Sequence, residues 1–148
     1  FTMKIKIFNR SSFELPVYET IGAAGMDVRA NESVSILPGK TVPVDTGLAF
    51  AIPEGYELQV RPRSGLSLKT SLRIANAPGT LDSDYRGTLK VLLWNTDTEK
   101  SFPIIEGERI AQIVVKAVPR IEWEPVDSFA ALGDTIRGSN GFGSTGKV

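Results

Sequence analysis

Short apolar stretches separated by turn residues recur along most of this chain. They are rich in β-branched and aromatic residues, which favours strands over helices. The stretches are MKIKIF from Met3, VSIL from Val34, TVPV from Thr41, GLAFAI from Gly47, YELQV from Tyr56, TLKVLLW from Thr88 and IAQIVVKAV from Ile110. Turn signals such as PG at Pro38 and PEG at Pro53 separate them. The pattern predicts an all-β domain, a β-sandwich or jelly roll.

Two segments depart from the strand pattern. SGLSLKTS from Ser64 is the one expected short helix, and Ser64 is its candidate amino-terminal cap. RGSNGFGSTGKV from Arg137 has four glycines and no apolar period, so we expect a flexible arm there. We therefore predict a β-domain over residues 1–136 and a Gly-rich carboxy-terminal arm over residues 137–148.

The composition excludes several kinds of chemistry. The 148 residues include no His and no Cys, which rules out a His-based triad, a cysteine nucleophile, a disulfide framework and the usual zinc sites. A general base must then be a carboxylate, and the available oxygen ligands suit Mg²⁺. With 17 basic and 17 acidic residues, the chain has no net charge to attract nucleic acid or an anionic membrane. It also lacks an apolar run of ~20 residues and a signal-peptide pattern, so we expect a cytoplasmic protein.

The run NAPGTLDSDYRG from Asn76 holds two acids and one tyrosine between strand-like stretches. In a chain without His, Asp82 is the best candidate for a general base that activates a water molecule. A polar turn whose Asp residues bind their own backbone is the alternative interpretation. Tyr85 is either a ligand platform or ordinary half-buried packing.

Two segments carry groups suited to phosphate. RPRSGLSLK from Arg61 places Arg63 before the expected helix, where its planar guanidinium could bind phosphate oxygens. An ordinary surface arginine is the alternative. GFGSTGK from Gly141 has the glycine spacing of a P-loop, but it lacks the preceding strand and following helix of that motif. Its glycines still allow close approach of backbone N–H groups to phosphate, and a plain disordered tail is the alternative.

Two further segments are weak by themselves. AAGMDVRA from Ala23 contains Asp27, and GERIAQ from Gly107 contains Gln112. An Asp after a Gly is typical of a turn, and a Gln in a strand is usually solvated. Neither segment alone indicates a function.

In this order, AAGMD, RSGLS, GTLDSDYRG, GERIAQ and RGSNGFGSTG resemble the five motifs of the trimeric dUTPase family, over most of the chain. The resemblance implies a distorted jelly-roll β-sandwich that assembles as a homotrimer. It also implies hydrolysis of dUTP to dUMP and pyrophosphate with Mg²⁺, which would limit uracil incorporation into DNA and supply dUMP for thymidylate synthesis.

The resemblance also implies roles for individual residues. Asp82 would activate the water that attacks the α-phosphorus, and Asp27 would hold Mg²⁺ through water. The residues implied to bind substrate are Arg63, Ser64, Gly65 and Gln112 at the phosphates, Asn76, Gly79, Thr80, Leu81 and Lys90 at uracil, Tyr85 under the deoxyribose, and Arg137, Phe142, Gly143, Ser144 and Thr145 in an arm from another subunit. Glu108, Ser67 and Pro78 depart from the commonest family pattern and put only the network behind the phosphates in doubt.

Two other functions stay open on the sequence. A dCTP deaminase of the same superfamily would need a catalytic Glu and a cytosine-reading pocket, which GTLDSDYRG fits poorly. A regulatory module could use a nucleotide-controlled arm to bind a protein partner, with or without catalysis.

Overall fold

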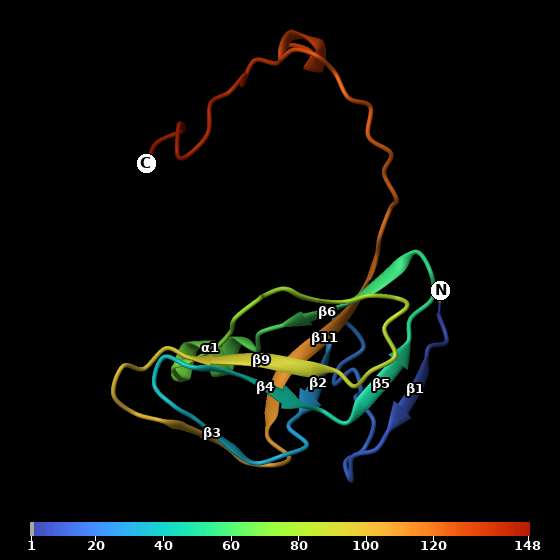
Figure 1. The fold of residues 1–148 in the computed structure, drawn as a ribbon, viewed down its shortest axis with the longest axis vertical. Helices are drawn as coiled ribbons and strands as arrows, with labels where there is room; N and C mark the ends of the chain where they lie inside the picture. Colours follow the sequence, from blue (N-terminus) through green and yellow to red (C-terminus); the bar gives the residue numbers. More distant parts are fainter. Residues whose placement is uncertain (1) are drawn as a thin grey trace.

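The computed structural model describes residues 2–148, and these fold almost entirely as β-structure (Figure 1). The strands are β1 (Lys6–Asn9), β2 (Met26–Arg29), β3 (Val34–Ile36), β4 (Thr41–Asp45), β5 (Leu48–Ala51), β6 (Tyr56–Arg61), β7 (Leu72–Ile74), β8 (Gly79–Leu81), β9 (Lys90–Asn95), β10 (Phe102–Ile104) and β11 (Arg109–Ala117). One α-helix, α1 (Ser64–Lys69), and one 3-10 turn, η1 (Ala130–Leu132), complete the described elements. The all-β prediction is confirmed.

The strands form small antiparallel sheets that wrap around one core. The largest sheet has the order β2-β11-β6-β8, and a second has the order β4-β9-β7. Two strand pairs, β1-β5 and β10-β3, close the remaining sides. Neighbours in these sheets are far apart in sequence, so the fold is a jelly-roll type of sandwich rather than a meander.

The core comes from the inward side of each strand. In β9, Val91 and Leu93 are fully buried while Lys90 and Trp94 point outward, as the two-residue period of a strand requires. Asn95 is the polar exception: it is fully buried, and its amide donates to the carbonyls of Ile36 and Lys100. Its side-chain oxygen accepts further hydrogen bonds, so burial leaves no unpaired group there.

The expected strands all appear, with ends shifted by a few residues. Four strands were not predicted: β2, β7, β8 and β10 have only three or four residues each. The turn interpretation of Asp27 is wrong, because Asp27 lies within β2. Ser64 is also not the helix cap: it is the first helical residue, Arg63 is in the cap position, and no side chain caps the helix.

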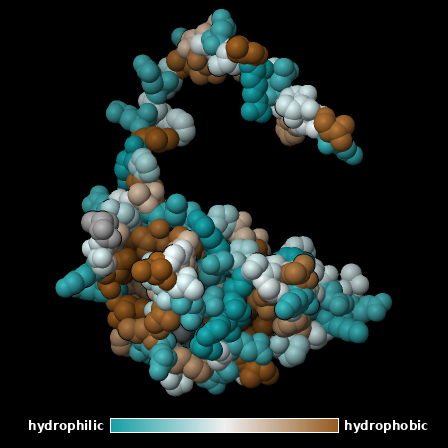
Figure 2. Space-filling view, turned by 180° about the vertical axis from the view of Figure 1, so that it is seen from behind, coloured by the Kyte–Doolittle hydropathy of each residue, from teal (hydrophilic) through white to brown (hydrophobic). Residues whose placement is uncertain are grey.

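The carboxy-terminal segment leaves the body where β11 ends. Every residue from 116 to 140 is exposed, and the segment arches away from the sheets (Figure 1). It carries large apolar side chains, including Trp123 at 82% exposure and Phe129 at 93%. Figure 2 shows brown, hydrophobic atoms at several places along the free arm, which lies well clear of most of the body. Burial does not change at residue 136, so the division into 1–136 and 137–148 stays a prediction.

Candidate active site

A cavity of about 250 Å³ lies beside β8 and the loop that leads from β8 to β9. Seven of the residues implied by the sequence line it: Asn76, Gly79, Thr80, Leu81, Asp82, Tyr85 and Lys90. Val60, Thr88, Leu89 and Leu92 complete the lining. This volume is slightly below the ~300–1,000 Å³ of pockets for drug-sized ligands, so it suits part of a nucleotide. We call this cavity the base pocket.

The local sequence explains why β8 can lie close to β6 and form one side of this pocket. Gly79 lies opposite Val60 in the β6-β8 pair, and a side chain on Gly79 would put its Cβ 3.1 Å from the Val60 Cβ. A glycine there lets β8 approach β6 closely. Leu81 is buried and anchors β8 to the core, while the intervening Thr80 is exposed.

Asp82 follows directly after β8 and begins the loop that leads to β9. It is exposed, and it lines both the base pocket and a neighbouring cavity of about 380 Å³. The backbone amide of Tyr85 donates to the carbonyl of Asp82, which fixes the turn. The carboxylate therefore stands at the pocket edge, accessible to a water molecule.

A second cluster lies where β2, β11 and β6 meet α1, and we call it the phosphate cluster. Asp27 pairs with Gln112 across β2 and β11. The Arg63 Nε donates to Asp27 Oδ1 at 3.1 Å, and the Gln112 amide donates to the carbonyl of Pro62 at 2.9 Å. Ser64 and Gly65 begin α1 directly after Arg63, and both are exposed. The structure thus brings together the predicted residues for metal and phosphate.

Two charged residues of this cluster were missed at the level of sequence. Arg109 Nε is 3.9 Å from Asp27 Oδ2, and Arg109 Nη2 is 3.8 Å from Glu19. The carboxylate of Asp27 therefore lies between two guanidinium groups. The one available signal was the position of Arg109 within GERIAQ, three residues before the predicted Gln112.

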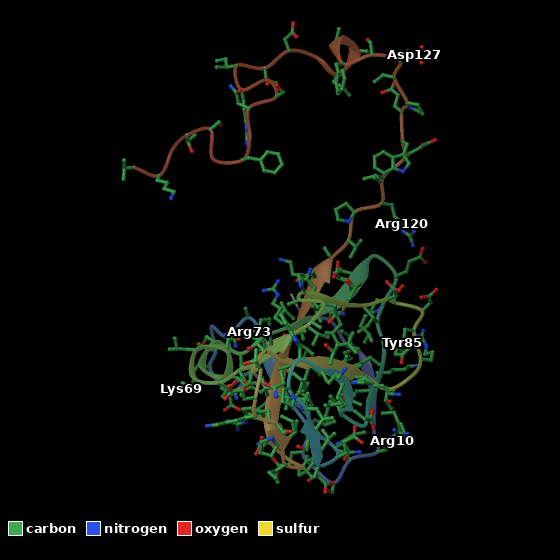
Figure 3. All side chains as sticks on the ribbon, turned by 60° about the vertical axis from the view of Figure 1, so that its left-hand side comes forward. Arg10, Lys69, Arg73, Tyr85, Arg120 and Asp127 are labelled. Carbon is green, nitrogen blue, oxygen red and sulfur yellow. The ribbon has the colours of Figure 1, made fainter. Side chains whose placement is uncertain are left out.

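The base pocket and the phosphate cluster lie at different ends of the β2-β11-β6-β8 sheet. Asp27 in β2 is in register with Gln112 in β11, and Gln112 is in register with Arg61 in β6. Asp82 follows β8, three strands from β2, and is level with a position four residues before Arg61 in β6. Standard strand spacings put the two acids roughly 20 Å apart. In Figure 3, α1 with Lys69 and the loop with Tyr85 lie on opposite sides of the body. The two predicted acids are not brought together within one chain.

The predicted residues of the arm lie near neither cluster. Phe142 is fully exposed, and the Arg137 Nε donates to the carbonyl of Asn140 within the arm. Gly143, Ser144 and Thr145 form local turns in the same segment.

The donor set at Asp27 fits a metal that arrives with its substrate. Within residues 2–148, no three His, Cys, Asp or Glu residues are grouped so that they could hold a metal ion by themselves. Mg²⁺ is commonly bound by one or two carboxylates, waters and substrate phosphates, rather than by a cage of protein ligands. A single carboxylate at Asp27 matches that mode of binding.

Asp45 supports the base pocket from behind. It pairs with Lys90 across β4 and β9, and its Oδ2 accepts a hydrogen bond from Arg10 at 2.8 Å. Burial acts to raise the pKa of this carboxyl, but the hydrogen bond and charge of Arg10, with polar groups of Thr88 and Gly47, hold the pKa below its usual value. The other oxygen, Oδ1, is buried without a well-aligned partner among the described residues.

Comparisons with known proteins connect this chain to one family. The dUTPase family model matches residues 11–146. The deoxyuridine 5'-triphosphate nucleotidohydrolase of Fusobacterium nucleatum is 49% identical over 147 residues, which are 98% of each chain. The dUTPase of Staphylococcus bacteriophage 80alpha, solved with dUPNHPP, is 29% identical with a TM-score of 0.87, and covers 99% of this chain and 100% of its own. A D95N mutant of the phage phi11 dUTPase, which coordinates a structural Mg(II) ion, has 25% identity and a TM-score of 0.78, with 86% and 99% covered.

The fold and the two clusters define a nucleotide-binding jelly-roll protein. More closely, the chain belongs to the dUTPase family.

Proposed function

We propose that the base pocket and the phosphate cluster together form the active site with which this chain hydrolyses dUTP to dUMP and pyrophosphate. The observation that carries the proposal is the base pocket itself: seven residues implied by one family resemblance line a single cavity. In this site Asn76 and the backbone of Gly79, Thr80 and Leu81 read the uracil edge, opposite Lys90.

Selectivity in this pocket follows from its shape. A close-fitting strand β8 that hydrogen-bonds the base edge rejects cytosine by the donor pattern of that base. Such a mismatch can discriminate between substrates by ~10⁴ or more. Attractive contact with one methyl group discriminates far less, so thymine is better excluded by lack of space. The Tyr85 ring packs under the deoxyribose and leaves no room for a 2′-hydroxyl.

The chemical step uses one carboxylate. Asp82 takes a proton from a water molecule, the water oxygen attacks the α-phosphorus in line, and pyrophosphate leaves without a covalent intermediate. Arg63, Ser64, Gly65 and Gln112 bind the phosphates. Mg²⁺, when bound with the triphosphate and held by Asp27 through water, supplies charge stabilisation for the leaving pyrophosphate.

The separation of the two clusters supports a site shared between chains. A general base must be within hydrogen-bond reach of its water, so Asp82 and an acid that holds the metal through water belong within roughly 10 Å of each other. Within one chain they are about 20 Å apart by strand spacing. We infer a homotrimer in which one subunit contributes the base pocket and a second the phosphate cluster. The arm of Arg137, Phe142, Gly143, Ser144 and Thr145 then closes the site and excludes water.

No described helix is long and apolar enough to cross a membrane. We propose that the protein acts on a free nucleotide in the cytoplasm, without nucleic acid or membrane as partner; its zero net charge gives no long-range attraction to either polyanion.

The direct test is pyrophosphate release from dUTP, dTTP, dCTP and UTP, each with and without Mg²⁺. We expect strong release from dUTP only, dependent on the metal. Ammonia release from dCTP would instead support a deaminase, and no cleavage or binding of dUTP would reject the proposal.

Mixing two inactive variants tests the shared site. Asp82→Asn loses the base, and Arg63→Ala loses a phosphate contact. If each site takes these residues from different subunits, randomly mixed trimers regain about a quarter of wild-type activity after joint refolding. In an equal mixture, half of the subunits have an intact Asp82 and the other half an intact Arg63, so about one site in four has both. Activity that stays at the level of the separate variants would place the site within one chain.

Deleting the arm tests its closing role. A chain that ends at Ile136 keeps every buried residue, so we expect the same assembly state and the same melting temperature, but little turnover. Full activity of the shortened chain would remove the arm from the proposed site.

A further inference from the structure

We propose that Gly87 is a specificity-determining positioning residue, because it leaves the space in which the Tyr85 ring lies and so sets that ring against the sugar. The inference rests on the proposed function, in which Tyr85 packs under deoxyribose. It concerns a residue that contacts no substrate itself.

The contact is within the turn that follows Asp82. The Tyr85 hydroxyl donates to the backbone carbonyl of Thr88 at 3.0 Å, which folds the phenol back across the turn. A Cβ built on Gly87 would lie 2.4 Å from the Tyr85 Oη and 2.6 Å from its Cζ. Side-chain carbons do not approach other heavy atoms this closely, so the observed ring position requires a residue without a side chain at 87.

The backbone gives no other reason for a glycine here. Gly87 is absent from the residues with positive φ, so alanine can adopt its conformation without strain. Gly79 differs, since a Cβ there would meet the Cβ of Val60, close to the backbone of β6. At Gly87 the obstructed atoms are the far end of one exposed side chain. A substitution at Gly87 therefore moves the Tyr85 ring and leaves β8 in place.

Movement of the ring changes the base pocket at the sugar end. Tyr85 and Thr88 both line the pocket, and Tyr85 is 43% exposed, so the ring has room to rotate. If the ring moves into the pocket, dUTP loses its place for deoxyribose. If it moves out, space opens for the 2′-hydroxyl of UTP. Outward movement lowers the ratio of kcat/KM for dUTP to kcat/KM for UTP, whereas inward movement lowers kcat/KM for dUTP itself.

The experiment compares four proteins: wild type, Gly87→Ala, Tyr85→Ala and the double variant. We expect Gly87→Ala to lower the dUTP to UTP ratio by roughly 10- to 100-fold, the scale on which a displacement of about 1 Å acts in an active site. Its melting temperature should stay within a few degrees of wild type, as for a surface substitution. In the Tyr85→Ala background the same glycine change should have no further effect on the ratio, because no ring remains to be displaced.

Gly22→Ala is the matched control, since Gly22 is an exposed loop glycine with ordinary φ and open space around its Cβ. It should leave the ratio unchanged. An unchanged ratio in Gly87→Ala, multiplicative effects of the two substitutions, or an unfolded Gly87→Ala would each overturn the role of Gly87. A wild-type enzyme that does not prefer dUTP over UTP would reject the proposed function itself, whatever the variants do.

Discussion

The base pocket and the phosphate cluster, the two halves of the proposed site, are built by different means. The base pocket is a cavity already shaped by backbone, with the buried Leu81 beneath it and a glycine at the tightest approach. The phosphate cluster is a set of opposite charges that neutralise one another: Asp27 accepts from Arg63 and lies near Arg109. A nucleotide can enter the first without rearrangement, but the phosphates must compete with Asp27 for Arg63.

This difference separates shape from charge within one site. In the proposed site, recognition of uracil depends on fixed geometry, so it should be insensitive to salt and sensitive to small steric changes. Binding of the triphosphate replaces one ion pair by others, so it should respond to ionic strength and to the loss of single charges. Three predictions test this division, and a fourth tests the ion pair behind the base pocket.

The largest effect is expected at Asp82. Asp82→Asn keeps the shape of the base pocket and removes the base, so turnover should fall by ~10²- to 10⁴-fold while a nonhydrolysable dUTP analogue still binds. Single-turnover rates and analogue binding by calorimetry give the two readouts. Near-normal turnover would show that another group activates the water.

At the other end, Arg63→Ala should lower kcat/KM for dUTP by roughly 10²-fold, since it removes a charge-assisted donor from the leaving group. Binding of deoxyuridine, which has no phosphate, should not change. Lys69→Ala, on the far end of α1, serves as the control for loss of a nearby positive charge. Equal losses for deoxyuridine and dUTP would contradict the division between shape and charge.

Ionic strength should distinguish the two halves in the unmodified protein. Raising the salt from 0.05 M to 0.5 M should weaken inhibition by pyrophosphate several-fold, because exposed charges are screened over a few Å at high salt. Inhibition by deoxyuridine should stay the same. Parallel salt curves for the two ligands would show that charge contributes equally to both.

The smallest effect is expected behind the base pocket, at Arg10 and Asp45. The lowered pKa of Asp45 means that the pair stabilises the folded chain above pH 3.8 and loses this contribution as the pH falls below that value, through the folded-state pKa. Arg10→Ala should therefore lower the free energy of unfolding at pH 7 by at most about 1 kcal/mol, because Arg10 is largely exposed. The difference in the free energy of unfolding between Arg10→Ala and wild type, measured by urea titration, should shrink below pH 3.8. If this difference grew on acidification, the ion pair would not lose its stabilising contribution at low pH, contrary to the prediction.

The longer strands were predictable because their apolar runs are local signals. The short strands β2, β7, β8 and β10 were not, since three or four residues become a strand only through a partner far away in sequence. Ser64 looked like a cap because serine commonly caps helices, but here the helix already includes it.

The motifs were enough to select the candidate site residues, but not to predict how the fold groups them. Sequence order places Arg63 only nineteen residues before Asp82, yet strand register puts them in different clusters. Register depends on non-local pairing, which no local pattern encodes. Arg109 and Glu19 were missed for a related reason, because only the fold brings Arg109 to Asp27 and Glu19 to Arg109.

The distance between Asp27 and Asp82 has a consequence for solutions of low protein concentration. A solitary subunit would retain its sheets, its cavity and its charged cluster, and it would still be unable to act on one nucleotide with both. Specific activity should then decline on dilution and recover on reconcentration, with no loss of secondary structure in either direction.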